Sequence, residues 1–114
     1  MKTLLILQEL MDLIESRRDQ PPEHSYTVTL LAGGIDRIGE KVSEEAAELV
    51  SAAAMLDGSE PRREEVIYEA ADLIYHLFVL LGFSRVRLHE VSAELQSRFG
   101  TSGLEEKASR KQQP

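Results

Sequence analysis

Apolar positions recur at helical spacing along most of this chain, and no stretch alternates as a β-strand would. Between residues 3 and 18, Leu4, Leu7, Met11 and Ile14 follow one another at steps of three or four residues. Two consecutive prolines shortly afterwards stop that pattern. The segment is therefore predicted to be an amphipathic helix with one face in a core.

The next segment, residues 23–34, is predicted to be a connector that contains one short helical turn. Ser25 is a suitable N-cap for a turn that runs through Leu31, because its hydroxyl can accept a hydrogen bond from a free backbone N–H. The Gly33-Gly34 pair is expected to break the turn.

Two long helices are predicted to follow, joined by a turn at Asp57-Gly58. The first runs from about Ile35 to Leu56, and the second opens near Pro61 and ends at Gly82. From Val66 onward the second of these helices is apolar on nearly every side, which is typical of a helix enclosed in a core.

A fourth long helix is predicted after Ser84, which would cap it, with a single apolar face that ends near Phe99. The polar residues 101–114 are predicted to be a mobile tail. Residues 1–100 are therefore predicted to form a single all-α domain that resembles a four-helix bundle. The first and third long helices have wider apolar faces than one short chain can cover, so a homodimer is expected to complete the bundle.

Composition narrows the class of protein. The chain has 114 residues, no cysteine and a formal net charge of −7. The absence of cysteine excludes disulfides, thiolate metal sites and a thiol nucleophile, and the negative charge argues against nucleic acid or an anionic membrane as a partner. The sequence has no uninterrupted apolar run of about 20 residues, and residues 1–14 are not expected to be a secretory signal, so a cytoplasmic protein is expected.

Two acidic clusters are the most informative chemical feature. Glu44, Glu45 and Glu48 lie in the second long helix, and Glu69 and Asp72 lie in the apolar third. Residues three apart share one face of a helix, so two facing clusters would collect several carboxylates in a small volume. Such a group requires a cation or bound protons, and an oxygen-only ligand set favours Mg²⁺ together with a phosphate substrate.

Other readings of these residues remain open at this stage. The glutamates of the second helix could simply form a solvated face. His76 could be a metal ligand, a proton donor or a buried hydrogen-bonding residue, and we expect it to hold the Asp72 carboxylate in place. Lys41 and Arg37 could be ion-pair partners of nearby glutamates or could bind substrate phosphate. Since no catalytic serine motif is visible, activated water is the expected nucleophile.

The acids match a known pattern. Glu44-Glu45-x-x-Glu48 followed by Glu69-x-x-Asp72 resembles the signature of the MazG-like all-α nucleotide pyrophosphohydrolases. Three further motifs, Ser25-Tyr26-Thr27, Lys41-Val42 and the run from Ala71 to His76, make residues 4–99 similar to the phosphoribosyl-ATP pyrophosphohydrolase family. The resemblance implies Mg²⁺-dependent conversion of phosphoribosyl-ATP to phosphoribosyl-AMP and pyrophosphate in histidine biosynthesis, by a stand-alone domain and a homodimer.

Carried over by position, the resemblance makes Glu45, Glu48, Glu69 and Asp72 the Mg²⁺ ligands. Glu44 would orient or deprotonate the attacking water or assist a second ion, and the roles of the two adjacent glutamates could be exchanged. Two rival hypotheses are a house-cleaning pyrophosphohydrolase that acts on ordinary or damaged nucleotides and a non-catalytic helical dimerisation module.

Overall fold

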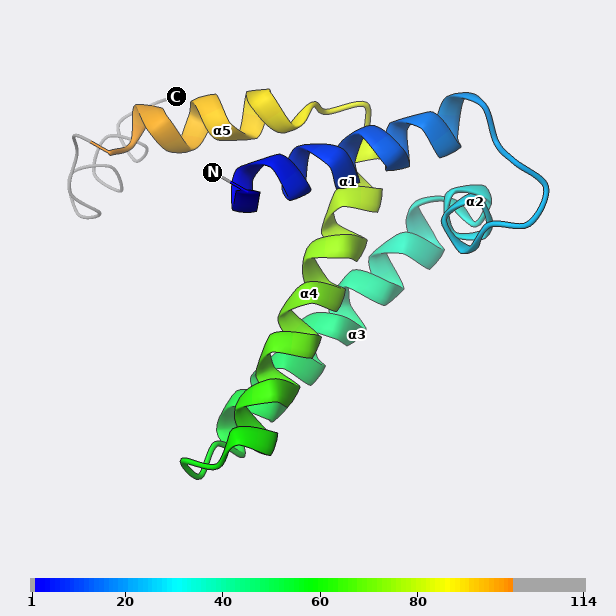
Figure 1. Cartoon of the computed structure of the whole chain (residues 1–114). Coiled ribbons are helices and arrows are strands. Elements are labelled where there is room, and N and C mark those ends of the chain that lie inside the picture. The colour runs from blue at the N-terminus through cyan, green and yellow to red at the C-terminus, as the bar shows by residue number, and fades with distance from the viewer. Residues whose placement is uncertain (1, 100–114) are drawn as a thin grey trace, which may run out of the picture.

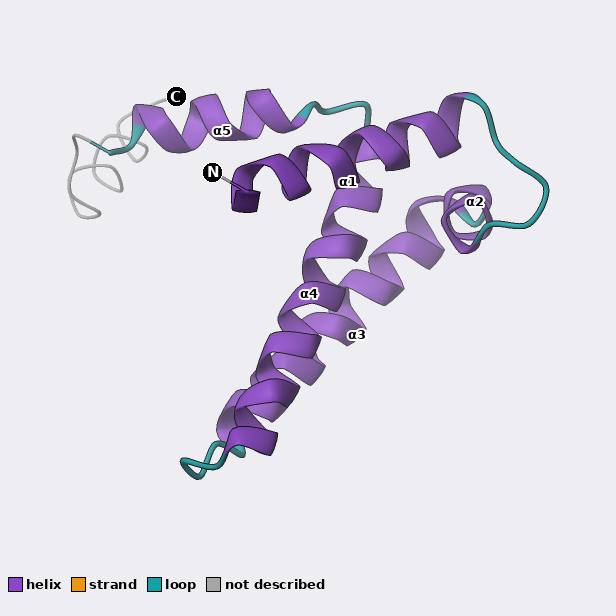
Figure 2. Cartoon of the chain, viewed as in Figure 1, coloured by secondary structure: helices purple, strands orange, loops and turns teal. Residues whose placement is uncertain are grey.

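The computed structural model describes residues 2–99, which form five helices and contain no strand. Figures 1 and 2 show these helices in chain order. They are α1 (Lys2–Asp19), α2 (Tyr26–Ala32), α3 (Gly34–Ala54), α4 (Glu60–Phe83) and α5 (Leu88–Ser97). The prediction of an all-α fold is confirmed. The predicted tail at 101–114 lies outside the described residues.

The helices α3 and α4 form a long antiparallel hairpin, and α1 crosses it near the end of α4 (Figure 1). The short α2 lies beside the start of α3 and brings the chain back from α1. The core forms where α1, α2, α3 and α4 meet, from Met11, Ile14, Leu30, Ile38, Phe78 and Val79. The radius of gyration of the structure is 16.8 Å, whereas that of a compact 100-residue domain is about 13 Å. The hairpin therefore extends as an arm from a small core.

The connector forms as the sequence predicts. Ser25 is the N-cap of α2, and its Oγ accepts a hydrogen bond from the backbone N–H of Val28 at 3.4 Å. The hydroxyl of Thr27 is hydrogen-bonded to that of Tyr75, which joins α2 to α4. These contacts place the start of α2 against the C-terminal half of α4.

The predicted boundaries at Gly82 and Ser84 are wrong. Helix α4 continues through Gly82 to Phe83, Ser84 is its C-cap, and α5 begins later, with Arg87 as the N-cap. The chain changes direction between α4 and α5, where Arg85 has a positive φ of 57°. The N-terminus of α5 is fixed because the Glu90 side chain accepts a hydrogen bond from the Arg87 backbone N–H.

Gly82 has a packing role that its sequence position does not reveal. It is buried against α1, where a Cβ at this position would lie 2.8 Å from Ile14 Cγ2. We expect Gly82→Ala to lower the free energy of unfolding by about 1–3 kcal/mol, measured by chemical denaturation. Gly39→Ala is the matched control, since a Cβ there meets nothing within 4 Å. It should raise stability by about 0.5–1 kcal/mol. Equal effects of the two substitutions would contradict the close approach of α1 and α4.

Much of the apolar surface of α4 is uncovered, contrary to the expectation of a fully enclosed helix. Ile67 and Leu77 are exposed, and Ile74 lies beside Ile6 and Leu13 at an apolar hollow of about 430 Å³ between α1 and α4. Of the described helices, α4 is long and apolar enough to cross a membrane, and 22% of its apolar window is buried. Helices α1 and α3 cover only part of its circumference, which leaves a broad apolar surface.

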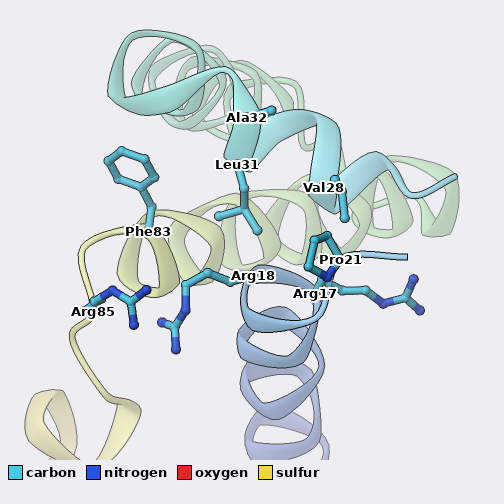
Figure 3. Close-up of a pocket in the computed structure, with 8 residues that line it drawn as sticks. All are labelled: Arg17, Arg18, Pro21, Val28, Leu31, Ala32, Phe83 and Arg85. Carbon is cyan, nitrogen blue, oxygen red and sulfur yellow. The ribbon is translucent and has the colours of Figure 1, made fainter. Parts of the chain in front are cut away.

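A second hollow, of about 380 Å³, lies where the ends of α1 and α4 meet α2 (Figure 3). The side chains of Leu31 and Phe83 line it, with arginines at its edge. Arg18 donates a hydrogen bond to the Gly82 carbonyl at 2.7 Å, and its hydrogen bonds to Asp19 lower the pKa of that carboxyl. Arg18 therefore satisfies a carbonyl at the end of α4 and stabilises this junction.

Candidate metal site

Three of the predicted carboxylates come together between α3 and α4. Glu45 and Glu48 extend from successive turns of α3, and Glu69 extends from the facing side of α4. One oxygen from each lies within 4.8 Å of the others. The spacing of three residues within α3 and the antiparallel packing of the two helices bring these groups to one place.

Two oxygens of this cluster are buried without a hydrogen-bond partner. They are Glu45 Oε2 and Glu69 Oε2, and Glu45 as a whole is only 4% exposed. A buried, unpartnered carboxylate oxygen is destabilising unless a cation is bound to it. The all-oxygen donor set fits a hard divalent cation such as Mg²⁺.

A hollow of about 360 Å³ opens beside the cluster. Its polar edge is formed by Glu48, Glu65 and Glu69. The remaining lining residues are small or apolar side chains of α3 and the residue that follows it, namely Ala47, Ser51, Ala52 and Met55. Glu65 is already paired with Arg62 at 3.3 Å. The cluster is therefore reachable from solvent along α3, even though Glu45 itself is buried.

The other two predicted acids lie at the margin of this group. Asp72 is half-buried one turn beyond Glu69, and its carboxylate is not among those within 4.8 Å. Glu44 is exposed, and its Oε2 is 3.5 Å from Lys41 Nζ. The structure thus brings together three of the four predicted ligands, and the ligand role of Asp72 stays a prediction.

The predicted cations of α3 differ in their surroundings. The side chain of Lys41 is 16% exposed, and its Nζ lies 3.4 Å from Glu45 Oε1. Burial opposes the charge on this ammonium group, but the negative charge of Glu44, the nearby Tyr26 and hydrogen bonds to both glutamates outweigh it, so the pKa of Lys41 is raised. Arg37 is half-exposed and pairs with Glu40 at 3.5 Å, in an ordinary i,i+3 contact.

Comparison with known proteins gives this site its context. The family model for phosphoribosyl-ATP pyrophosphohydrolase matches residues 7–99, which is most of the chain. The chain belongs to the phosphoribosyl-ATP pyrophosphohydrolase family. It is 50% identical to the phosphoribosyl-ATP pyrophosphatase of Rhodopirellula baltica, over 96% of this chain and 89% of that protein. It is 48% identical to the enzyme of the same name from Geobacter metallireducens, over 92% of each chain.

One relative of the phosphoribosyl-ATP pyrophosphohydrolase family is a longer protein. The histidine biosynthesis bifunctional protein of Helicobacter hepaticus is 48% identical over 93% of this chain, but the match covers only 44% of that protein. The same unit therefore occurs both by itself and as part of a larger chain.

His76 contacts the backbone of Asp72 rather than its carboxylate. His76 is 4% exposed, and its Nδ1 is 2.8 Å from the Asp72 carbonyl oxygen. Because a carbonyl oxygen only accepts hydrogen bonds, His76 donates from Nδ1 in this contact. The hydroxyl of Tyr26 lies 3.5 Å from Nε2. The expected contact with the Asp72 carboxylate is thus replaced by one with its backbone.

Sequence reasoning did not single out Tyr75, which lies next to His76 and completes an aromatic group with Tyr26. The rings of the two tyrosines are stacked with centroids 6.4 Å apart, and His76 stands edge-on to both. Nothing in the order of residues predicts that contact, since Tyr26 belongs to α2 and depends on how α2 packs. The group joins α2 to the part of α4 that carries Asp72.

Proposed function

We propose that this protein hydrolyses phosphoribosyl-ATP to phosphoribosyl-AMP and pyrophosphate in histidine biosynthesis. The observation that carries the proposal is the convergence of Glu45, Glu48 and Glu69, with two buried oxygens that lack partners. The printed names of the relatives from Rhodopirellula baltica and Geobacter metallireducens support the choice of substrate. The name of the bifunctional relative supports the pathway.

Mg²⁺ is the proposed cofactor. Glu45, Glu48 and Glu69 would hold it. Asp72 lies one turn after Glu69 on α4 and would be the fourth ligand. When bound, Mg²⁺ neutralises the phosphates and stabilises the charge that develops on departing pyrophosphate.

The chain's own groups can perform the remaining tasks. Glu44 is exposed beside the cluster, where its carboxylate can orient a water molecule and accept a proton from it. The ammonium group of Lys41 can bind a phosphate oxygen as a point charge. Arg37, one turn before Lys41 on α3, can bind a phosphate oxygen further from the cluster.

Substrate competition tests the proposed reaction. With Mg²⁺ present, we expect release of pyrophosphate from phosphoribosyl-ATP with a kcat/KM at least about 100-fold above that for any standard deoxynucleoside triphosphate. Two phosphoribosyl contacts worth about 1.4 kcal/mol each give this ratio. Equal rates on both substrate classes would instead indicate a general nucleotide pyrophosphohydrolase. No Mg²⁺-dependent release from either class would refute the enzymatic role.

We also propose that the working form is a cytoplasmic homodimer. The support is the apolar surface of α1 and α4, where Ile6, Leu13 and Ile74 remain exposed around a hollow. A second copy has the same surface, so a two-fold dimer can bury it on both chains at once. This burial would complete the core that a single chain leaves open.

A further inference from the structure

Lys41 is the one cation in direct contact with the carboxylate cluster in the described part of the chain. Its Nζ lies 3.4 Å from Glu45 Oε1 and 3.5 Å from Glu44 Oε2. Among the side chains of residues 5–99, no other lysine, arginine or histidine nitrogen lies within 4 Å of the carboxylates of Glu45, Glu48 or Glu69. The cluster therefore has three acidic groups and a single contacting positive charge.

The contact with Lys41 gives the two carboxylate oxygens of Glu45 different surroundings. Oε1 faces Lys41, while Oε2 is buried and has no hydrogen-bond partner. An ammonium group next to the cluster stabilises a buried carboxylate before a cation binds, but it also repels a divalent cation that approaches the same group. Lysine has a flexible stem and rotatable donors, so its charge can move to another acceptor without any change in the backbone.

We propose that Lys41 is the internal counter-ion of the carboxylate cluster and that divalent cation binding frees its ammonium group for a substrate phosphate. The exchange couples the two binding events, because the cation takes over the neutralisation of Glu45 and Lys41 then needs a new anion. This inference rests on the proposed function, since it takes the cluster as the cation site. Beyond the proposed function, it states that Lys41 weakens binding of the cation and strengthens binding of the phosphate.

The test compares the whole protein with its Lys41→Met and Lys41→Gln variants, without substrate. Titration calorimetry with Mg²⁺ alone should show binding about tenfold tighter in both variants, because a positive charge has been removed. In saturating Mg²⁺, inorganic pyrophosphate should bind about tenfold more weakly to both. Without Mg²⁺, Lys41→Met should melt several degrees lower than the wild type, because Glu45 loses its partner. Lys41→Gln removes the charge but keeps a hydrogen-bond donor, so it provides the test if Lys41→Met does not fold.

Two further variants separate charge from structure. Lys41→Arg keeps the charge and should bind Mg²⁺ as the wild type does. Arg63→Met removes an exposed i,i+3 pair with Glu60 elsewhere on α4, and should change neither affinity. Unchanged or weaker Mg²⁺ binding in both Lys41→Met and Lys41→Gln would overturn the counter-ion role. Failure of the wild type to bind Mg²⁺ would instead refute the cation site on which the proposed function depends.

Discussion

Glu69→Gln is expected to lower the activity sharply and, at the same time, to raise the melting temperature of the protein in the absence of Mg²⁺. Loss of one carboxylate ligand should lower kcat/KM by a factor of about 1,000, the equivalent of about 4 kcal/mol. Glu69 Oε2 is buried without a partner beside Glu45 and Glu48, so removing its charge relieves repulsion. A gain of about 1 kcal/mol would raise the melting temperature by about 4 °C or more.

Calorimetric scans with and without Mg²⁺ would measure the melting temperatures, and an assay of pyrophosphate release would measure the loss of activity. Mg²⁺ should stabilise the wild type by mass action and should stabilise Glu69→Gln far less. Glu64→Gln is the matched control, because Glu64 is exposed on the same helix and outside the cluster. A Glu69→Gln protein with full activity, or one that is less stable than the wild type without Mg²⁺, would show that the carboxylates do not form a strained cation site.

Ile74→Asp is expected to convert the proposed homodimer into monomers. Ile74 is 37% exposed at the apolar hollow between α1 and α4. In a two-fold interface the loss occurs on both chains, at about 2 kcal/mol each, which would weaken association by a factor of about 1,000. Analytical ultracentrifugation should give twice the chain mass of 12.8 kDa for the wild type and that mass itself for the variant.

The matched control is Gln96→Glu, which adds a charge at an exposed polar position of α5. It should sediment as the wild type does. A wild-type protein that sediments at the mass of one chain at micromolar concentration would contradict the homodimer. It would also leave the exposed face of α4 without the partner proposed for it.

The sequence predicted most of the fold because helical periodicity and turn chemistry are local properties. Ser25 is the N-cap of α2, as predicted, and Asp57-Gly58 lies in the turn between α3 and α4, although α3 already ends at Ala54 and not at Leu56. The prediction was wrong at Gly82 and Ser84, since a glycine within a helix can serve close packing instead of ending it. That distinction depends on the position of Ile14, about 70 residues earlier along the chain, which no local pattern contains.

The candidate site was likewise predictable only where local patterns were sufficient. Spacing alone placed Glu45 and Glu48 on one face of a helix, and the apolar context singled out Glu69 and Asp72. Neither signal shows how α3 and α4 are rotated about their axes, which decides how close Asp72 and Glu44 come to the other carboxylates. The packing of α2, which brings Tyr26 to His76, was beyond local patterns for the same reason.

The positions of the chain ends have a consequence for how this unit can be built into larger proteins. The start of α1 and the end of α5 lie on the same side of the molecule, whereas the turn between α3 and α4 points away from them (Figure 1). A neighbouring domain joined at either end can therefore be accommodated without covering the hairpin arm. Covalent linkage to a further part of a longer chain, as in the bifunctional relative, needs no change in the helices that carry the carboxylates.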